Sequence, residues 1–201
     1  MNSSRDEIYE RYLTRAITEI NELGDQIAHC ARAAHTTRAP VVGSGHPLAD
    51  IFLLKYAPSS SELAEGVAFY GRAGQAVLKS VQRLGIDPLL LYGTNCVKCA
   101  DVPDDVRRAA CPVWLVQELA IVQPKLVVVM GEEALAVLNA LPLPLRRPVE
   151  AEHGVVQKLT PTIEAVYVPA IEESLDDQAA KRRFWDAFRV IGEWYEALPP
   201  Y

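Results

Sequence analysis

The sequence predicts an α/β fold, with a short, mainly parallel four-stranded sheet covered by helices on both faces. Short apolar runs, typical of buried strands, alternate along the chain with longer segments whose apolar residues recur at helical spacing. Parallel neighbours need a crossover between them, so this alternation favours helices packed on both faces of a sheet. The length of 201 residues suits one domain, and no internal repeat or low-complexity tract interrupts the pattern.

The first half of the chain predicts two helices and two strands. Apolar residues at helical spacing predict an N-terminal helix within residues 1–35. Residues 51–54 are an apolar run after a turn, which indicates a buried strand. Helical spacing returns over residues 74–84, and Gly85 follows as a C-cap glycine would. The run at residues 89–94 predicts the second strand.

The second half repeats the alternation. Strand-like runs at residues 126–130 and 165–168 are each followed by a helical pattern, and residues 152–160 are expected to form an irregular strand pair outside the four. The predicted helices are residues 104–122, residues 132–141 and a closing amphipathic helix at residues 176–197.

Composition and charge exclude several classes of protein. Half of the residues are hydrophobic and 23% are charged, which is ordinary globular usage rather than that of a disordered chain. No apolar run approaches the roughly 20 residues of a membrane-spanning helix, and the polar N-terminus shows no targeting segment. We therefore expect a cytoplasmic protein with no membrane partner. The formal net charge of −6 argues against nucleic-acid affinity over the whole surface, but it does not exclude a local basic groove that binds nucleic acid.

Four loops follow the carboxyl ends of the predicted strands, where sites lie in folds of this class. These loops are residues 55–71, 95–103, 131–133 and 169–174. We therefore expect the functional residues there.

Several sequence blocks in and around these loops match one family in the right order. The blocks are residues 57–74, 92–99, 110–115 and 123–131, with Val168-Pro169 near the end. They resemble the GEAPG…GRPFVGRAG, YITNVVKC, ACRPYL and RPKVIVALG segments and the HPS motif of bacterial family 4 uracil-DNA glycosylases. The resemblance runs from about Cys30 to Trp194.

This resemblance implies a single three-layer α/β/α domain over residues 1–201 that flips a base out of DNA into a pocket. Phe69 matches the family's stacking aromatic residue, and Asn95 matches the amide that pairs with the uracil edge. Ala57 belongs to the same expected base-binding set. The alternatives are a loop aromatic packed on the sheet for Phe69 and a strand-end turn residue for Asn95.

DNA contacts are expected at Gly71, Arg72 and Lys181. Gly71 permits a positive φ and a close backbone approach where the loop enters a helix, and the helix N-terminus beside Arg72 can hold a phosphate. Lys181 belongs to a short basic run that could touch phosphate, although such runs are usually solvated helix faces.

Two catalytic positions of the family are replaced in this chain. Tyr56 stands where the family has the acidic residue that positions the attacking water, and Val168 stands where it has the histidine that stabilises the leaving uracil anion. Tyrosine is a weak base at neutral pH and valine has no polar side-chain atom. The catalytic residues are thus unassigned, and the two replacements argue against ordinary uracil excision.

The four cysteines suggest a metal centre rather than disulfides, since no signal peptide is visible. The resemblance implies a 4Fe-4S cluster, which needs four thiolates. Three cysteines match its ligand positions, the fourth position is Ala33, and an extra cysteine lies three residues before the VKC cysteine. The expected ligands are Cys30, Cys96, Cys99 and Cys111. Zinc on the same thiolates, a three-cysteine site completed by His29 or His35, and no metal are the alternatives.

The resemblance therefore predicts a monomeric DNA-repair protein that binds DNA, single-stranded or containing uracil, and holds a flipped base. The alternative is a catalytically inactive relative that serves as a nucleic-acid-binding, nucleobase-binding or interaction domain. A redox protein built on Cys96 and Cys99 is disfavoured, because this CxxC follows a strand and not the helix N-terminus that lowers a thiol pKa.

Overall fold

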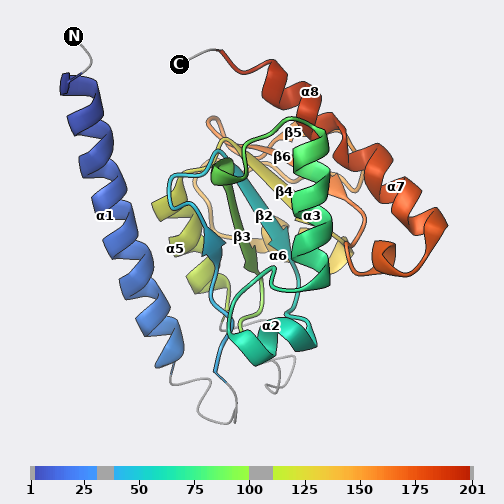
Figure 1. The fold of residues 1–201 in the computed structure, drawn as a ribbon, viewed down its shortest axis with the longest axis horizontal. Helices are drawn as coiled ribbons and strands as arrows, with labels where there is room; N and C mark the ends of the chain where they lie inside the picture. The colour runs from blue at the N-terminus through green and yellow to red at the C-terminus, as the bar shows by residue number, and fades with distance from the viewer. Residues whose placement is uncertain (1–2, 31–38, 100–110, 200–201) are drawn as a thin grey trace.

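A six-stranded sheet with the order β1-β3-β2-β4-β6-β5 forms the centre of the computed structural model, which describes residues 3–30, 39–99 and 111–199 (Figure 1). The four central strands pair in parallel. They are β3 (Leu91–Asn95), β2 (Ile51–Lys55), β4 (Leu126–Met130) and β6 (Glu164–Val168). This confirms the α/β class and its parallel centre.

The predicted count of four strands was wrong, because two short strands add antiparallel edges. β1 (Ser44–Gly45) pairs with β3, and β5 (Val156–Lys158) pairs with β6. β5 lies within residues 152–160, where an irregular strand pair was expected. Strands of two or three residues show no period that a sequence pattern could reveal.

Helices cover both faces of the sheet and make the three layers. One face is covered by α1 (Ser3–Ala28), α5 (Pro112–Val122) and α6 (Glu132–Ala140). The other is covered by α3 (Arg72–Arg83), α7 (Gln178–Phe188) and α8 (Val190–Glu196). No helix in the described part of the chain combines the length and the apolar character needed to cross a membrane.

The strands divide their side chains between two cores. Phe52, Leu54 and Val129 contribute to the core beneath α5 and α6, whereas Ile51 and Leu53 contribute to the core beneath α3 and α7. Successive side chains of a strand point to opposite faces, so each central strand contributes to both cores. Because both of its faces are buried, its sequence is continuously apolar.

Several predicted boundaries differ from the structure. The N-terminal helix ends at Ala28, and residues 31–38 lie outside the described residues. Of the helix predicted over residues 104–122, the described part begins at Pro112. The closing helix is divided at Arg189 into α7 and α8.

Three short helical elements complete the chain. α2 (Ser60–Glu65) lies beyond the carboxyl ends of the strands, in the loop that joins β2 to α3 (Figure 1). The 3-10 turn η2 (Pro88–Leu90) precedes β3, and η3 (Glu173–Leu175) follows β6. α2 and η3 therefore border the edge of the sheet where the predicted site residues are found.

Candidate functional site

The carboxyl ends of the parallel strands place four side chains in one row. Asn95 pairs with Lys55, Lys55 with Met130, and Met130 with Val168 in the strand register. Met130 and Val168 belong to the core beneath α3 and α7, so the row lies on that face of the sheet. Lys55 is the immediate neighbour of Asn95. Val168 is three strands away from Asn95, roughly 14 Å at the usual strand spacing.

Asn95 carries a buried amide group that has no hydrogen-bond partner. Within the described residues, neither its Oδ1 nor its Nδ2 has an acceptor or donor in reach, and both atoms are inaccessible to solvent. An unsatisfied buried polar group costs about 1–3 kcal/mol of stability. A side chain that offers one donor and one acceptor, both unused, is a natural reader of a base edge.

Phe69 packs directly against the strand that carries Asn95. A Cβ atom placed on Gly93 would meet Phe69 Cδ2 at 2.5 Å, so only glycine admits the ring at this position of β3. Gly93 and Asn95 lie on the same face of the strand, because they are two residues apart. The structure therefore brings Phe69 and Asn95 to one end and one face of β3. A cavity of about 150 Å³ borders Phe69 and Gly93, but Asn95 is not among its lining residues.

The loop that carries Phe69 is held in an uncommon backbone conformation. Phe69 has a φ of 59°, the left-handed region that non-glycine residues rarely adopt. Its backbone N–H donates to Glu62 Oε1, and its carbonyl oxygen would lie 1.6 Å from a Cβ on Gly74. Glu62 is also the N3 residue of a capping box on α2, with Ser59 at the N-cap. These contacts hold the Phe69 backbone in this conformation.

Lys55 places a buried positive charge beside Asn95 and Phe69. Its side chain is 2% exposed, and its Nζ donates to Glu62 Oε2 at 2.7 Å, Glu172 Oε1 at 2.8 Å and Ala57 O at 2.9 Å. The same nitrogen lies 5.9 Å from the centroid of the Phe69 ring, within cation–π range. The resemblance to the family motifs did not point to Lys55 or Glu62. The signals that could have found them are a lysine that ends the apolar run at residues 51–54 and the Ser59-x-x-Glu62 pattern of a capping box.

The two replaced catalytic positions do not lie with the cluster formed by Lys55, Phe69 and Asn95. Tyr56 is half-buried and packs against the core beneath α5 and α6, which lies on the opposite face of the sheet from Met130 and Val168. Val168 is buried in the core beneath α3 and α7. Ala57 reaches the cluster through its backbone carbonyl, which accepts the bond from Lys55.

The predicted DNA-binding residues lie on the outer border of the same edge. Gly71 has a φ of 89° and is the N-cap of α3. Arg72 is exposed, and its Nη2 donates to Asp176 Oδ1 at 2.5 Å and to Leu175 O at 3.3 Å. Hydrogen bonding to Asp176, followed by its charge, raises the pKa of Arg72 above its ordinary value. Lys181 is exposed on α7.

The cysteines do not form a metal site in the arrangement described. All carry thiols rather than disulfides, and they are Cys30, Cys96, Cys99 and Cys111. Cys96 is buried beside Cys111, and burial is the main cause that raises the pKa of the Cys96 thiol. Among the described residues, no three histidine, cysteine, aspartate or glutamate side chains converge as ligands. The cluster therefore remains a prediction, tested by iron and sulfide analysis after anaerobic purification.

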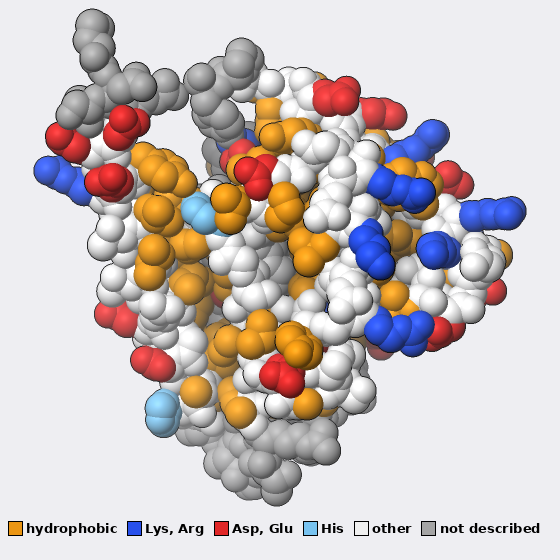
Figure 2. Space-filling model, viewed as in Figure 1, with side chains coloured by type: hydrophobic (Ala, Val, Ile, Leu, Met, Phe, Trp, Pro, Cys, Tyr) orange, Lys and Arg blue, Asp and Glu red, His pale blue; other side chains and the backbone are white. Residues whose placement is uncertain are grey.

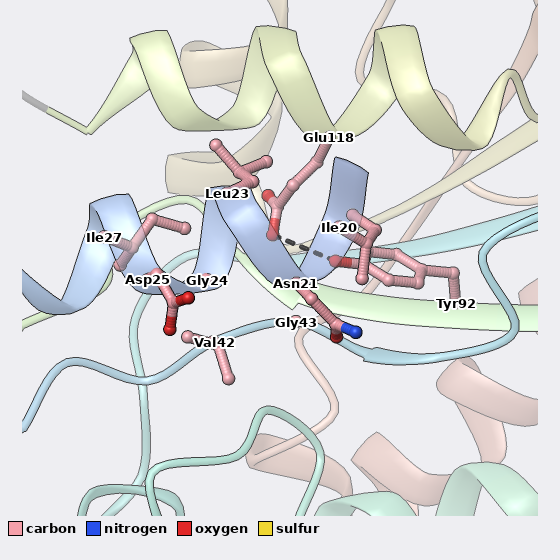
Figure 3. A pocket seen from close by; sticks show the side chains of 10 residues that line it. All are labelled: Ile20, Asn21, Leu23, Gly24, Asp25, Ile27, Val42, Gly43, Tyr92 and Glu118. Carbon is pink, nitrogen blue, oxygen red and sulfur yellow. Dashed lines mark hydrogen bonds between the residues drawn. The ribbon is translucent and has the colours of Figure 1, made fainter. Parts of the chain in front are cut away.

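A second cavity, of about 390 Å³, lies between α1, β3 and α5 (Figure 3). Its polar wall is formed by Tyr92, whose hydroxyl donates to Glu118 Oε1 at 3.2 Å. Glu118 also accepts from Lys98 Nζ at 2.7 Å and from Thr94 Oγ1 at 2.9 Å. The polar side chains of this wall bond to one another, and Asn21 and Asp25, which also line the cavity, are exposed to solvent, so this cavity has no buried unpartnered group like the amide of Asn95 among the described residues.

Comparisons with known proteins identify one family. Residues 42–189 match the family model described as the Uracil DNA glycosylase superfamily. The Type-4 uracil-DNA glycosylase of Sulfurisphaera tokodaii is 31% identical over 99 residues, which cover 47% of this chain and 45% of that protein. The protein of the same name from Thermotoga maritima is 29% identical over 131 residues, covering 62% and 67%. That from Pyrobaculum aerophilum is 29% identical over 119 residues, covering 56% and 61%.

The match with the relative from Sulfurisphaera tokodaii spans about half of that protein. The match with the relative from Pyrobaculum aerophilum spans about three fifths of that protein. The family match covers 148 of the 201 residues, from the segment before β1 to the end of α7. It includes every strand of the sheet and the whole row from Asn95 to Val168. The chain belongs to the uracil-DNA glycosylase superfamily and resembles its family 4 members.

Proposed function

We propose that this protein acts in DNA repair by binding DNA and holding one flipped nucleobase between the Phe69 ring and the Asn95 amide. The observation that carries the proposal is the amide of Asn95, buried without a partner among the described residues, on the face of β3 against which the Phe69 ring packs. A flipped base supplies a flat face for stacking and an edge that pairs with an amide. The names of the curated relatives, each a uracil-DNA glycosylase, support uracil as the base.

Hydrolysis of the glycosidic bond is expected to be weak or lost. Tyr56 packs into the opposite core, and Val168 offers no donor to a leaving base. Loss of a positioned base and of a donor to the leaving group costs several powers of ten in rate. The proposal therefore rests on recognition, and excision is a separate measurement.

Binding to a substrate analogue tests recognition without interference from turnover. The probe is a single-stranded oligonucleotide with one 2′-fluoro-2′-deoxyuridine, compared by fluorescence anisotropy with the same strand carrying 2′-fluoro-2′-deoxycytidine, whose pairing edge has no ring N–H. We expect tighter binding of the uracil strand, and loss of that preference in Asn95→Ala but not in Asn21→Ala, an exposed asparagine on α1. Equal affinity for both strands in the wild-type protein at low salt would contradict the proposal.

Excision is tested on strands that contain uracil, hypoxanthine or xanthine, followed by heating in alkali. Strand breakage that depends on Asn95 would establish a glycosylase. Uracil-dependent binding without breakage would establish the alternative, a superfamily member that binds nucleobases in DNA and has lost catalysis.

A further inference from the structure

Lys55 is a buried charge whose role the superfamily resemblance does not assign. It ends β2 in the centre of the sheet, and its ammonium group uses all three of its protons, on Ala57 O, Glu62 Oε2 and Glu172 Oε1. A buried ion pair is costly to assemble and contributes little net stability, so its retention calls for another explanation.

The two carboxylates on Lys55 differ in how firmly they are held. Glu62 is fully buried and also accepts hydrogen bonds from the backbone N–H groups of Ser59 and Phe69. The side chain of Glu172 is 44% exposed, and the bond to Lys55 is the hydrogen bond that the structure gives it. Glu172 can therefore leave Lys55 at much lower cost than Glu62 can.

While Glu172 is bound to Lys55, the described part of the site lacks hydrogen-bond partners for the Asn95 amide. Asn95 pairs with Lys55 in the register of β2 and β3, and both polar atoms of its amide are buried with no partner in the part of the chain that the structure describes. A heterocycle with a ring N–H beside a carbonyl oxygen would satisfy the Asn95 amide. A second carbonyl oxygen on the same ring would be an acceptor for the ammonium group next to it.

We propose that Lys55 is a base-binding residue and that Glu172 occupies its outward hydrogen bond until the carbonyl oxygen of a flipped base displaces it. The ligand class is a dicarbonyl nucleobase with a ring N–H, presented by DNA. This inference rests on the proposed function, because it concerns the same site. Glu62 holds the ammonium group in position, and the exposed Glu172 carboxylate stands where the base oxygen binds.

The same anisotropy assay tests the inference with a third strand, which carries a tetrahydrofuran abasic site. Glu172→Gln removes the competing charge, so its affinity for the 2′-fluoro-2′-deoxyuridine strand should rise about tenfold, the scale of one hydrogen bond to a charged group. Its affinity for the abasic strand should rise no more than in Glu173→Gln. Glu173 is the exposed neighbouring residue, and its substitution removes the same charge without touching Lys55.

Lys55→Met should lower the affinity for the uracil analogue to the level of the abasic strand. Because this substitution leaves Glu62 buried without its cation, Lys55→Met/Glu62→Gln serves as a second variant, with circular dichroism as the check on folding. The Glu172→Gln result stands alone if neither variant folds.

The outcomes separate this inference from the proposed function. Equal affinities of Glu172→Gln and Glu173→Gln for the uracil analogue, or a uracil preference that survives in a folded Lys55 variant, would overturn the role of Lys55 alone. A wild-type protein with no uracil preference would overturn the proposed function first.

Discussion

At the scale of single residues, the Asn95 side chain is one that lowers the stability of the folded protein. Asn95 ends β3 beside the buried Lys55, yet both atoms of its amide are buried without partners in the described structure. Burial of an amide without compensating bonds is unfavourable by any transfer scale. A ligand that supplies both bonds accounts for the choice of residue.

Replacement of Asn95 by leucine should therefore stabilise the protein while it abolishes base recognition. Leucine has the same number of heavy atoms, the same branching at Cγ and no unsatisfied polar atoms, so we expect the free energy of unfolding to rise by about 1–2 kcal/mol. Urea unfolding followed by circular dichroism measures the change. A loss of more than about 1 kcal/mol would mean that the amide has a partner in the folded protein.

Tyr92 predicts a pH dependence of stability at the same scale. Burial, followed by the negative charge of Glu118, raises the pKa of its phenol well above the ordinary value. In the unfolded chain the phenol ionises near pH 10, so its contribution is complete below that pH and is lost as the pH rises further. Tyr92→Phe should lose about 1 kcal/mol at pH 7 with the bond to Glu118.

The same variant should lose less stability than the wild type when the pH is raised to about 10.5. Urea midpoints at the two pH values provide the comparison, with Tyr70→Phe as the control, because Tyr70 is exposed. Parallel pH profiles for wild type and Tyr92→Phe would show that this phenol is not the group that titrates.

The resemblance of flanking motifs to a family nominates Phe69 and Asn95 as base-binding residues, and the structure brings the two to one end of β3. The resemblance does not indicate the residues that position them. Lys55 and Glu62 stand outside those matched roles, and their meeting depends on a turn after β2 that brings two charges within 2.7 Å. A contact of this kind is set by tertiary packing, which a one-dimensional pattern does not contain.

At the scale of elements, a buried ion pair fastens α5 to the end of β3. Lys98 follows the strand, Glu118 lies on the helix, and both are 1% exposed with 2.7 Å between Nζ and Oε2. Thr94 and Tyr92, both on β3, add hydrogen bonds to the same carboxylate. The pair fixes the position of α5 relative to the end of β3.

Removal of one partner of this pair should cost far more than removal of both. Lys98→Met leaves Glu118 buried without its cation, which is expected to lower the free energy of unfolding by about 3–5 kcal/mol. Lys98→Met/Glu118→Leu should recover most of that loss, because no unpaired charge remains. Denaturant unfolding of the two variants measures the difference. A double variant no more stable than the single one would show that Thr94 and Tyr92 need the carboxylate.

The long elements could be predicted from the sequence, whereas β1 and the break in the closing helix could not, and β5 was anticipated only as part of an irregular strand pair at residues 152–160. The apolar pattern of residues 176–197 continues past Arg189, and the junction itself contains neither glycine nor proline. β1 and β5 are fixed by pairing with strands already in place, and their sequences show no alternation of their own. Local pattern specifies the central strands because burial on both faces demands apolar residues.

At the scale of the whole molecule, the charge distribution matters more than the net charge. The formal charge is −6, which opposes general affinity for DNA. Figure 2 shows that lysine and arginine side chains gather over the side of the molecule formed by α3 and α7. The exposed basic residues of these helices are Arg72, Lys79, Arg83, Lys181, Arg182 and Arg183. Contact with DNA is therefore expected on this side, next to the strand ends.

Arg72 is the member of this face that lies at the N-terminus of α3, closest to the Phe69 loop. Its ion pair with Asp176 is exposed on both sides, at 66% and 76%, so it contributes little to folding and leaves the guanidinium available to a phosphate. Arg72→Ala should leave the thermal midpoint unchanged and weaken binding to every DNA strand alike. The slope of log affinity against log salt should fall by about one.

Arg11→Ala is the matched control, because Arg11 is an exposed arginine on α1, on the other side of the sheet. It removes the same charge and should leave the salt slope unchanged. Asp176→Asn should strengthen binding, since the carboxylate competes with phosphate for Arg72. Equal salt slopes for Arg72→Ala and Arg11→Ala would place the phosphate contact elsewhere, and the base site at the strand ends would then have to be reached from a different face.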